Sequence, residues 1–392
     1  MSTLKVNKIE HTSTTDGGVS IDSSGNVTLP ANTKVGTQNL PSAGPLSNRN
    51  LIINGAMNIW QRGTSSTGLG GGSAYLADRW MFEALGGTAA RVTYDRVEDS
   101  PTISDDVNYS PYSARITITT TGGTASGDFG LLRQMIEGYN FQHIYQRPFT
   151  VSFWVKSSIT GTFAFSAYGG AVTTGTPSFT QTYTIDTADT WEYKTISVPA
   201  CPAGTLSNWS FTSGRGLDVM WRLWDNASSH SGTLGEWNTN TYSVPDASYT
   251  NLAGTNGATW QITQVQIEPG SVATPFEHRS FGDELARCQR YYCKTYNQDV
   301  FPGASDKQGS LFVYKNSSNN AGWNFNFPVQ MRAVPSFSTY SHAGTVDKCS
   351  FSTTDISTST NGPINGSARI MIYANGAVAD DCYVHVAASA EL

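Results

Sequence analysis

Aromatic side chains that lie among Asp, Asn and Arg are the residues in this sequence best suited to bind a ligand, and residues 209–242 are rich in them. Sugar rings present flat C–H faces that pack on aromatic rings, while polar side chains bond the hydroxyl groups. The predicted sugar contacts are Trp224, Trp237, Tyr242, Asp225 and Asn226. Val219, Trp221 and Leu223 alternate as core residues do. For Trp224 and Trp237 a core role remains the alternative.

A second candidate surface lies near the carboxyl end, where a polar loop precedes a tryptophan. Residues 314–320 read Tyr-Lys-Asn-Ser-Ser-Asn-Asn, and Trp323 follows closely. The predicted ligand contacts there are Tyr314, Asn316 and Trp323. The alternative is that this stretch forms ordinary hairpin turns.

No motif predicts a catalytic centre. The sequence contains no Gly-x-Ser-x-Gly elbow, phosphate-binding loop or His-Glu-x-x-His pair. Hydrolysis of a glycosidic bond needs two carboxylates about 5–10 Å apart. Asp105–Asp106 and Asp380–Asp381 are adjacent pairs, which point to opposite faces on a strand. We therefore expect a binding protein without catalytic residues, and not an enzyme.

Composition limits the class of partner. The chain has 392 residues, a net charge of −6 and 14% charged residues, without a cluster of Lys or Arg. We do not expect nucleic-acid binding, because phosphate contacts require concentrated cationic side chains. No apolar run approaches the ~18 residues that cross a bilayer, so no membrane insertion is expected. The amino end also lacks the pattern of a signal peptide.

Histidine and cysteine usage predicts neither a transition-metal site nor a disulfide framework. The six His residues occur singly, without metal-ligand spacing. The five Cys residues are odd in number and widely spaced, and the chain is large enough to form a hydrophobic core without disulfide bonds. We expect reduced thiols.

The stretch from Trp260 to Tyr296 marks a domain boundary. Residues 262–267 alternate apolar and polar side chains, which predicts a half-buried strand, and Pro269-Gly270 ends it. Ser280 can then cap a helix whose third residue is Asp283. A β domain over 50–282 is therefore followed by a linking helix within 283–298.

The segment 50–282 reads as a series of strands separated by Gly, Asn and Pro. Strict alternation over Phe149–Lys156 is the strongest single strand signal. About ten strands without intervening helices fit an all-β jelly-roll sandwich. The predicted strands cover 51–53, 79–82, 90–94, 113–119, 130–137, 149–156, 161–168, 179–185, 191–198, 218–223 and 260–267.

The two ends of the chain form further segments. In 1–49, short strands are predicted at 19–21 and 27–29, and the apolar anchors are Leu4, Val6, Ile9, Val19 and Ile21. Such ribbons are marginal alone. Either copies from other subunits complete these strands and the segment docks to a larger assembly, or the segment is a flexible leader. Residues 299–392 contain five or more predicted strands, enough for a small β-sandwich, at 310–314, 322–327, 336–340, 369–373 and 383–387.

Two motifs resemble a known class of protein. Asn-Leu-Ile-Ile-Asn-Gly-Ala-Met-Asn-Ile-Trp-Gln-Arg at 50–62 and Ala-Thr-Pro-Phe-Glu-His-Arg-Ser at 273–280, followed by Glu-Leu-Ala-Arg-Cys-Gln-Arg-Tyr-Tyr, resemble bacteriophage tail-fibre proteins. The order of segments in 50–282 is similar to carbohydrate-binding modules of the CenC type. Gly-Gly-Val-Ser-Ile-Asp at 17–22 resembles the tail-attachment segments of phage fibres.

These resemblances imply a homotrimeric virion protein, made in the host cytoplasm, whose amino end attaches to a tail or baseplate protein. They imply a host surface polysaccharide or lipopolysaccharide as receptor, with the C-terminal domain a possible tip. A structural Ca²⁺ at Glu268 and the segment near Asn58 is also implied, although that segment lacks the usual carboxylate. No other cofactor is expected. The alternatives are a structural baseplate adaptor without host contact and a virion-associated polysaccharide depolymerase.

Overall fold

The computed structural model divides the chain into two compact units, Met1–Gly44 and Pro45–Leu392. In the first unit it describes only short strands. In the second it describes residues 48–86, 90–101, 110–170, 176–203, 209–226, 232–238, 249–313, 321–351, 354–359, 366–374 and 382–392.

The first unit contains two small antiparallel ladders. β1 (Lys8–Ile9), β2 (Val19–Ile21) and β3 (Val27–Thr28) form a three-stranded sheet. β4 (Lys34–Val35) pairs with β5 (Gln38–Asn39). Strands were predicted at 19–21 and 27–29, and β2 and β3 confirm both. Of the predicted anchors, Ile9 lies on β1, Val19 and Ile21 lie on β2, and Leu4 and Val6 lie outside the described residues.

The second unit begins with the predicted jelly-roll sandwich, built from two antiparallel sheets. The first sheet has six strands. Its order is β15 (Glu192–Val198), β12 (Phe149–Ser157), β18 (Thr259–Pro269), β10 (Ser113–Thr120), β9 (Arg91–Val97) and β6 (Ser65–Leu69).

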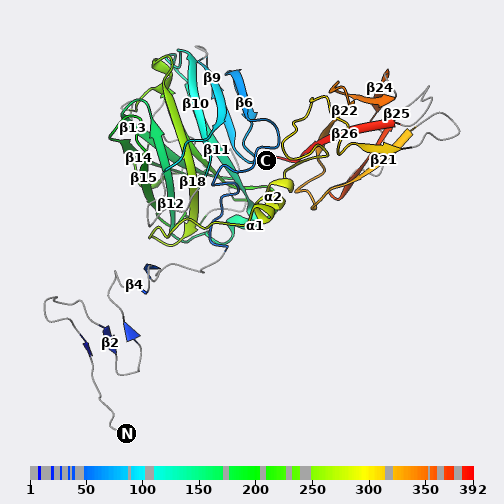
Figure 1. The fold of residues 1–392 in the computed structure, drawn as a ribbon. Helices are drawn as coiled ribbons and strands as arrows, with labels where there is room; N and C mark the ends of the chain where they lie inside the picture. Colours follow the sequence, from blue (N-terminus) through cyan, green and yellow to red (C-terminus); the bar gives the residue numbers. More distant parts are fainter. Residues whose placement is uncertain are drawn as a thin grey trace, which may run out of the picture. The chain divides into compact units, whose positions relative to one another are not determined.

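The second sheet of the sandwich has seven strands. Its order is β17 (Trp237–Asn238), β14 (Ser178–Ile185), β13 (Gly161–Gly169), β16 (Arg215–Asn226), β11 (Asp128–Glu137), β8 (Met81–Leu85) and β7 (Gly72–Tyr75). A short helix, α1 (Gly138–Phe141), and a 3₁₀ turn, η1 (Leu252–Gly254), connect strands. Figure 1 shows the long strands of the sandwich running beside one another, with α1 near their ends.

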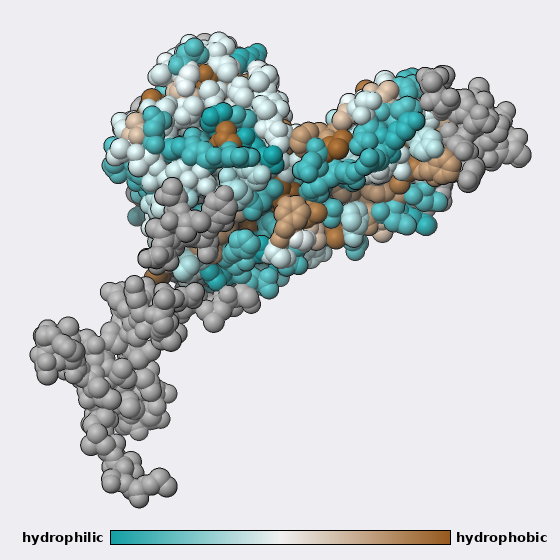
Figure 2. Space-filling view, viewed as in Figure 1, coloured by the Kyte–Doolittle hydropathy of each residue, from teal (hydrophilic) through white to brown (hydrophobic). Residues whose placement is uncertain are grey.

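Side-chain alternation explains how the two sheets enclose one core. Val151, Phe153 and Val155 of β12 point inward, as do Val219 and Trp221 of β16, and all are fully buried. Because strand side chains alternate between faces, the residues between them lie on the outer faces. Figure 2 shows mainly hydrophilic and neutral residues on the visible surface, with hydrophobic residues in separate patches.

The predicted helix is confirmed as α2 (Phe281–Gln289), and Ser280 is its N-cap, since Ser280 Oγ accepts a hydrogen bond from Asp283 N at 3.2 Å. The C-terminal sheet follows, with β26 as the strand that most others join. Its strands are β19 (Tyr292–Lys294), β20 (Leu311–Val313), β21 (Ala321–Asn326), β22 (Ser336–Tyr340), β23 (Lys348–Phe351), β24 (Thr354–Ser359), β25 (Arg369–Ala374) and β26 (Cys382–Ser389). The segment predicted to link the domains thus contains both α2 and β19, which already pairs with β26.

One predicted strand was wrong. Leu51–Ile53 is not a strand, although Leu51 N donates to Ile267 O of β18 at 2.8 Å. Within the part of the chain that the structure describes, no helix is long and apolar enough to span a membrane.

Candidate functional site

The outer face of the six-stranded sheet carries an aromatic cluster made of Trp154, Tyr193 and Trp191. Trp154 lies on β12 between the inward Phe153 and Val155, so its ring lies on the outer face. Tyr193 of β15 is its direct cross-strand partner, with ring centroids 5.4 Å apart and planes tilted by 48°. Tyr193 is 43% exposed, so the pair presents aromatic surface to solvent.

Trp191 extends this cluster and is held by two charged neighbours. Its indole Nε1 donates to Asp99 Oδ1 at 3.1 Å, and Lys156 Nζ lies 5.2 Å from its ring centroid. Lys156 also forms an ion pair with Asp99. Burial alone would raise the pKa of Asp99, but the hydrogen bonds from Lys156 and Trp191 outweigh it and hold that pKa below its ordinary value. The carboxylate therefore stays ionised and keeps the indole in place.

A polar row starts at Lys156 and crosses the same face. Cross-strand partners share a face, so the register defines the row directly. It consists of Lys156 of β12, Gln261 of β18, Arg115 of β10, Asp95 of β9 and Ser65 of β6. With neighbouring strands about 4.8 Å apart, these five strands extend the row over about 19 Å.

The charges along the row are compensated within the protein. Arg115 binds Asp95 through two nitrogens, at 3.2 and 2.6 Å, and Lys156 is paired with Asp99. Gln261 is only 5% exposed and accepts a hydrogen bond from Ser113 Oγ at 3.1 Å, so it supports the row from below. Hydroxyl and paired ionic groups beside aromatic rings are suited to the hydroxyls and C–H faces of sugars. The face is thus equipped for an uncharged stretch of glycan, and both of its outer strands, β15 and β6, are edges of the sheet.

The sequence-based prediction for Trp224 was wrong. Its side chain is only 2% exposed and packs in the sandwich core, 6.1 Å from Phe82 between ring centroids. Asp225 forms an ion pair with Arg222, and Asn226 donates to Thr124 O. These residues therefore support the sheet and present no aromatic surface to a ligand.

The remaining predicted contacts have different outcomes. Trp323 is 2% exposed in the C-terminal core, so its prediction as a ligand contact was also wrong. Trp237 is half-buried, packs against Phe179 and Trp209, and donates from Nε1 to Pro199 O at 2.8 Å. It stays a prediction. Tyr242, Tyr314 and Asn316 lie outside the described residues, as do Asp105–Asp106 and Asp380–Asp381.

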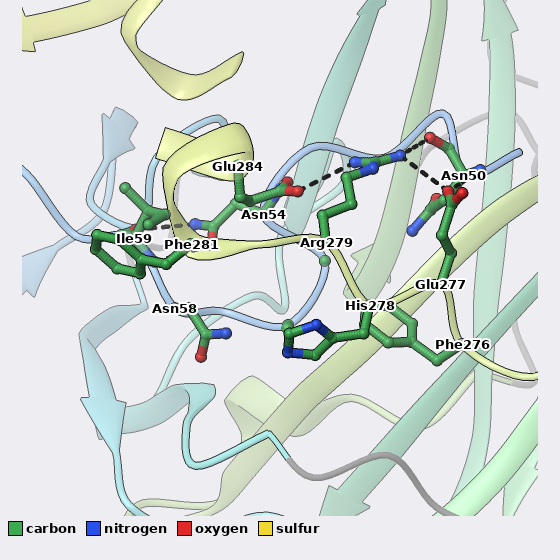
Figure 3. Close-up of a pocket in the computed structure, with 12 residues that line it drawn as sticks. Asn50, Asn54, Asn58, Ile59, Phe276, Glu277, His278, Arg279, Phe281 and Glu284 are labelled. Carbon is green, nitrogen blue, oxygen red and sulfur yellow. Dashed lines mark hydrogen bonds and ion pairs between the residues drawn. The ribbon is translucent and has the colours of Figure 1, made fainter. Parts of the chain in front are cut away.

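A small pocket lies where the opening segment of the sandwich meets its closing segment (Figure 3). Arg279 joins the two segments, since it donates to Asn50 O and Ile52 O and forms ion pairs with Glu277 and Glu284. The cavity measures about 70 Å³, which is room for roughly five waters and too little for a sugar chain. This pocket is a structural junction.

A wider groove of about 730 Å³ runs beside α2 and is lined by Arg279, Arg287 and Arg290. Each of these arginines is engaged within the protein. Arg290 binds both carboxylate oxygens of Glu137, at 2.9 and 2.6 Å, and Arg287 donates to Asn48 Oδ1 at 2.9 Å. The cationic side chains that line the groove are therefore already paired within the protein.

The calcium ion implied at Glu268 and Asn58 stays a prediction. The carboxylate of Glu268 accepts hydrogen bonds from Thr274 N and Gln266 Nε2, both at 2.8 Å, and Arg49 Nε lies 3.3 Å from it. Glu268 is thus already paired with a guanidinium within the protein. No group of three or more potential ligands for a metal occurs among the residues with a described position.

The chain matches no protein-family model and no curated protein. Among solved structures, it is similar to the enzymatically active domain of Bacteriophage CBA120 tailspike protein 4, with 15% identity, a TM-score of 0.29, and coverage of 49% of this chain and 19% of that one. It is also similar to the family 11 carbohydrate-binding module from Clostridium thermocellum, with 11% identity, a TM-score of 0.28, and coverage of 55% and 98%. It is similar as well to a family 16 carbohydrate-binding module, with 8% identity, a TM-score of 0.22, and coverage of 46% of this chain and 84% of that one. These TM-scores are too low to assign a ligand, which must come from the side chains of this chain.

Proposed function

We propose that this protein is a non-enzymatic phage tail-fibre protein that binds a glycan of the host cell surface during adsorption. The observation that carries the proposal is the solvent-facing Trp154–Tyr193 pair on the outer sheet face, continued by Trp191 and the polar row. Aromatic rings on a flat polar face bind sugar rings without any need for a deep cleft. The receptor is a surface polysaccharide or lipopolysaccharide.

The virion role rests on the motif resemblance at both ends of the sandwich. In the structure these motifs meet: Asn50 N donates to Glu277 at 2.9 Å, and Asn54 N to Glu284. The paired motifs therefore close the domain. The separate unit Met1–Gly44 is the segment we assign to attachment to the tail or baseplate.

Weak single sites suffice for such a protein if it is a homotrimer, as the resemblance implies. Linked sites can raise avidity by about 10² to 10⁴ over one site. A shallow sheet face would then hold a virion on a cell, while individual contacts could still release and rebind.

The decisive experiment is inhibition of phage adsorption by the purified full-length chain and by Trp154→Ala/Tyr193→Ala. We expect the unchanged protein to compete, and the double variant to need about tenfold or more higher concentration. Tyr139→Ala is the matched control, because Tyr139 is 52% exposed but lies on α1.

Two other outcomes would replace the proposal. If the unchanged protein does not compete, a structural baseplate adaptor without host contact becomes the better explanation. If host polysaccharide incubated with the protein releases new reducing ends, the protein is a depolymerase.

A further inference from the structure

Two of the five cysteines lie together in the C-terminal sheet. All five carry buried thiols. Cys349 and Cys382 belong to the same core cluster, and their side chains are hydrogen-bonded to each other. The other three are placed differently: Cys201 accepts from Gln146 N at 3.2 Å, Cys288 lies on α2 and Cys293 on β19.

The strand register explains why these two thiols meet. β23 pairs with β26 at two positions, Ser350 opposite Tyr383 and Phe351 opposite Cys382. Cys349 lies two residues before Phe351, so its side chain points to the same face as that of Cys382. The two cysteines are therefore diagonal neighbours on one face of an antiparallel pair.

We propose that Cys349 and Cys382 are a latent disulfide, which closes when the folded protein meets an oxidising medium that contains small-molecule disulfides. Diagonal neighbours have Cα atoms about 7–8 Å apart, whereas a disulfide spans up to about 7 Å. β23 must therefore move by on the order of 1 Å. Only two register positions tie β23 to β26, so this movement disturbs little of the sheet.

The oxidation is a thiol–disulfide exchange with a low-molecular-weight disulfide such as oxidised glutathione. One protein thiolate attacks a glutathione sulfur, forms a mixed disulfide and releases one reduced glutathione. The second protein thiolate then attacks the protein sulfur of that mixed disulfide and releases the second reduced glutathione. The two protein thiols lose two protons and two electrons, and the electrons reduce the glutathione disulfide.

Burial controls how fast this exchange occurs. Both side chains are fully buried, and burial raises the pKa of the Cys349 thiol to about 12. Thiolate is therefore scarce, and the small disulfide reaches the pair only when this part of the sheet opens locally. The two cysteines are therefore reduced when the chain is synthesised, and the disulfide between them forms slowly.

The bond would tie the two strands between the cysteines to the central strand of the sheet. The loop it closes contains β24 and β25, whereas β26 pairs with β19, β20, β22 and β23. A loop of this size predicts a melting temperature roughly 5 °C higher for the unit Pro45–Leu392.

The test uses the full-length chain, incubated with oxidised glutathione in mildly alkaline buffer, with and without sub-denaturing urea. After denaturation, titratable thiols are counted and linked peptides are mapped by mass spectrometry without reduction. We expect the count to fall from five to three, with Cys349 linked to Cys382. Cys349→Ser must abolish both the linkage and the rise in melting temperature, whereas the matched control Cys201→Ser must keep both.

Three results would overturn the proposal. Five thiols could persist in both buffers, stable glutathione adducts could form at Cys349 or Cys382 without ring closure, or the linked peptides could join other cysteines.

Discussion

Trp221 and Trp154 have opposite roles because strand parity gives them opposite environments. Trp221 is fully buried, with ring centroids 5.2 Å from Phe165 and 5.5 Å from both Trp80 and Phe153. Trp154 contacts Tyr193 on an outer face. We expect Trp221→Ala to lower the free energy of unfolding by about 3–5 kcal/mol and Trp154→Ala by well under half of that. Urea denaturation measures both, and equal losses would show that Trp154 is a core residue.

The alternation of apolar and polar residues predicts the sheet face of Trp154 correctly, but it does not predict that of Trp224. The alternation over Phe149–Lys156 already places Trp154 on the solvent-facing side of the strand. An aromatic side chain at such a position indicates a ligand contact, and the sequence analysis did not use that signal. Trp224 follows the buried Leu223, yet it is buried too, because the ladder shifts register between Gly130 and Leu131. A β-bulge of this kind breaks the two-residue period, and nothing local in the sequence marks it.

At the scale of elements, a glycine holds the opening segment against β18. Val265 N donates to Gly55 O at 3.0 Å, and a Cβ on Gly55 would lie 2.2 Å from the backbone oxygen of Val265. We expect Gly55→Ala to lower the free energy of unfolding by about 1–3 kcal/mol, since the clash is with backbone and cannot be relieved by a rotamer. Thermal denaturation measures this loss. The matched control is Gly72→Ala, where a Cβ would meet nothing within 4 Å, and a similar loss there would contradict the explanation.

Strands with apolar alternation were predictable, whereas strands held by their neighbours were not. β12 and β16 contain alternating apolar residues and were predicted. β6 reads Ser-Ser-Thr-Gly-Leu and β24 reads Thr-Asp-Ile-Ser-Thr-Ser, so neither has an apolar face of its own. Each is a strand because an adjacent strand supplies its hydrogen bonds, which is a tertiary effect.

At the scale of the molecule, a buried ionic cluster joins the sandwich to the end of the C-terminal sheet. Glu391 forms ion pairs with Arg62, at 2.8 Å, and with Arg79, and Arg332 donates to Ser213 O at 2.9 Å. We expect Glu391→Gln to lower the free energy of unfolding by about 3–5 kcal/mol, because it leaves the buried guanidinium of Arg79 without its carboxylate and leaves Arg62 with Asp78 alone. Urea denaturation tests this against Glu236→Gln, which changes an exposed carboxylate. An equal loss of stability in the two variants would show that the ion pairs of Glu391 do not stabilise the fold.

The same cluster makes stability depend on pH through Asp78. Burial raises the pKa of Asp78 to about 7 from an ordinary value of 3.8, although Arg62 and Gln61 oppose the change. Between these values the folded chain holds a proton that the unfolded chain has released, so stability falls as pH rises through this window.

Asp78→Asn removes this titration. The stability of the unchanged protein relative to Asp78→Asn should therefore be greatest near pH 4, and should decline to a plateau above pH 7. Thermal denaturation of both proteins across this range isolates the effect, because all other titrating groups are shared. A constant difference would mean that Asp78 stays ionised, held by Arg62 at 3.0 Å, throughout.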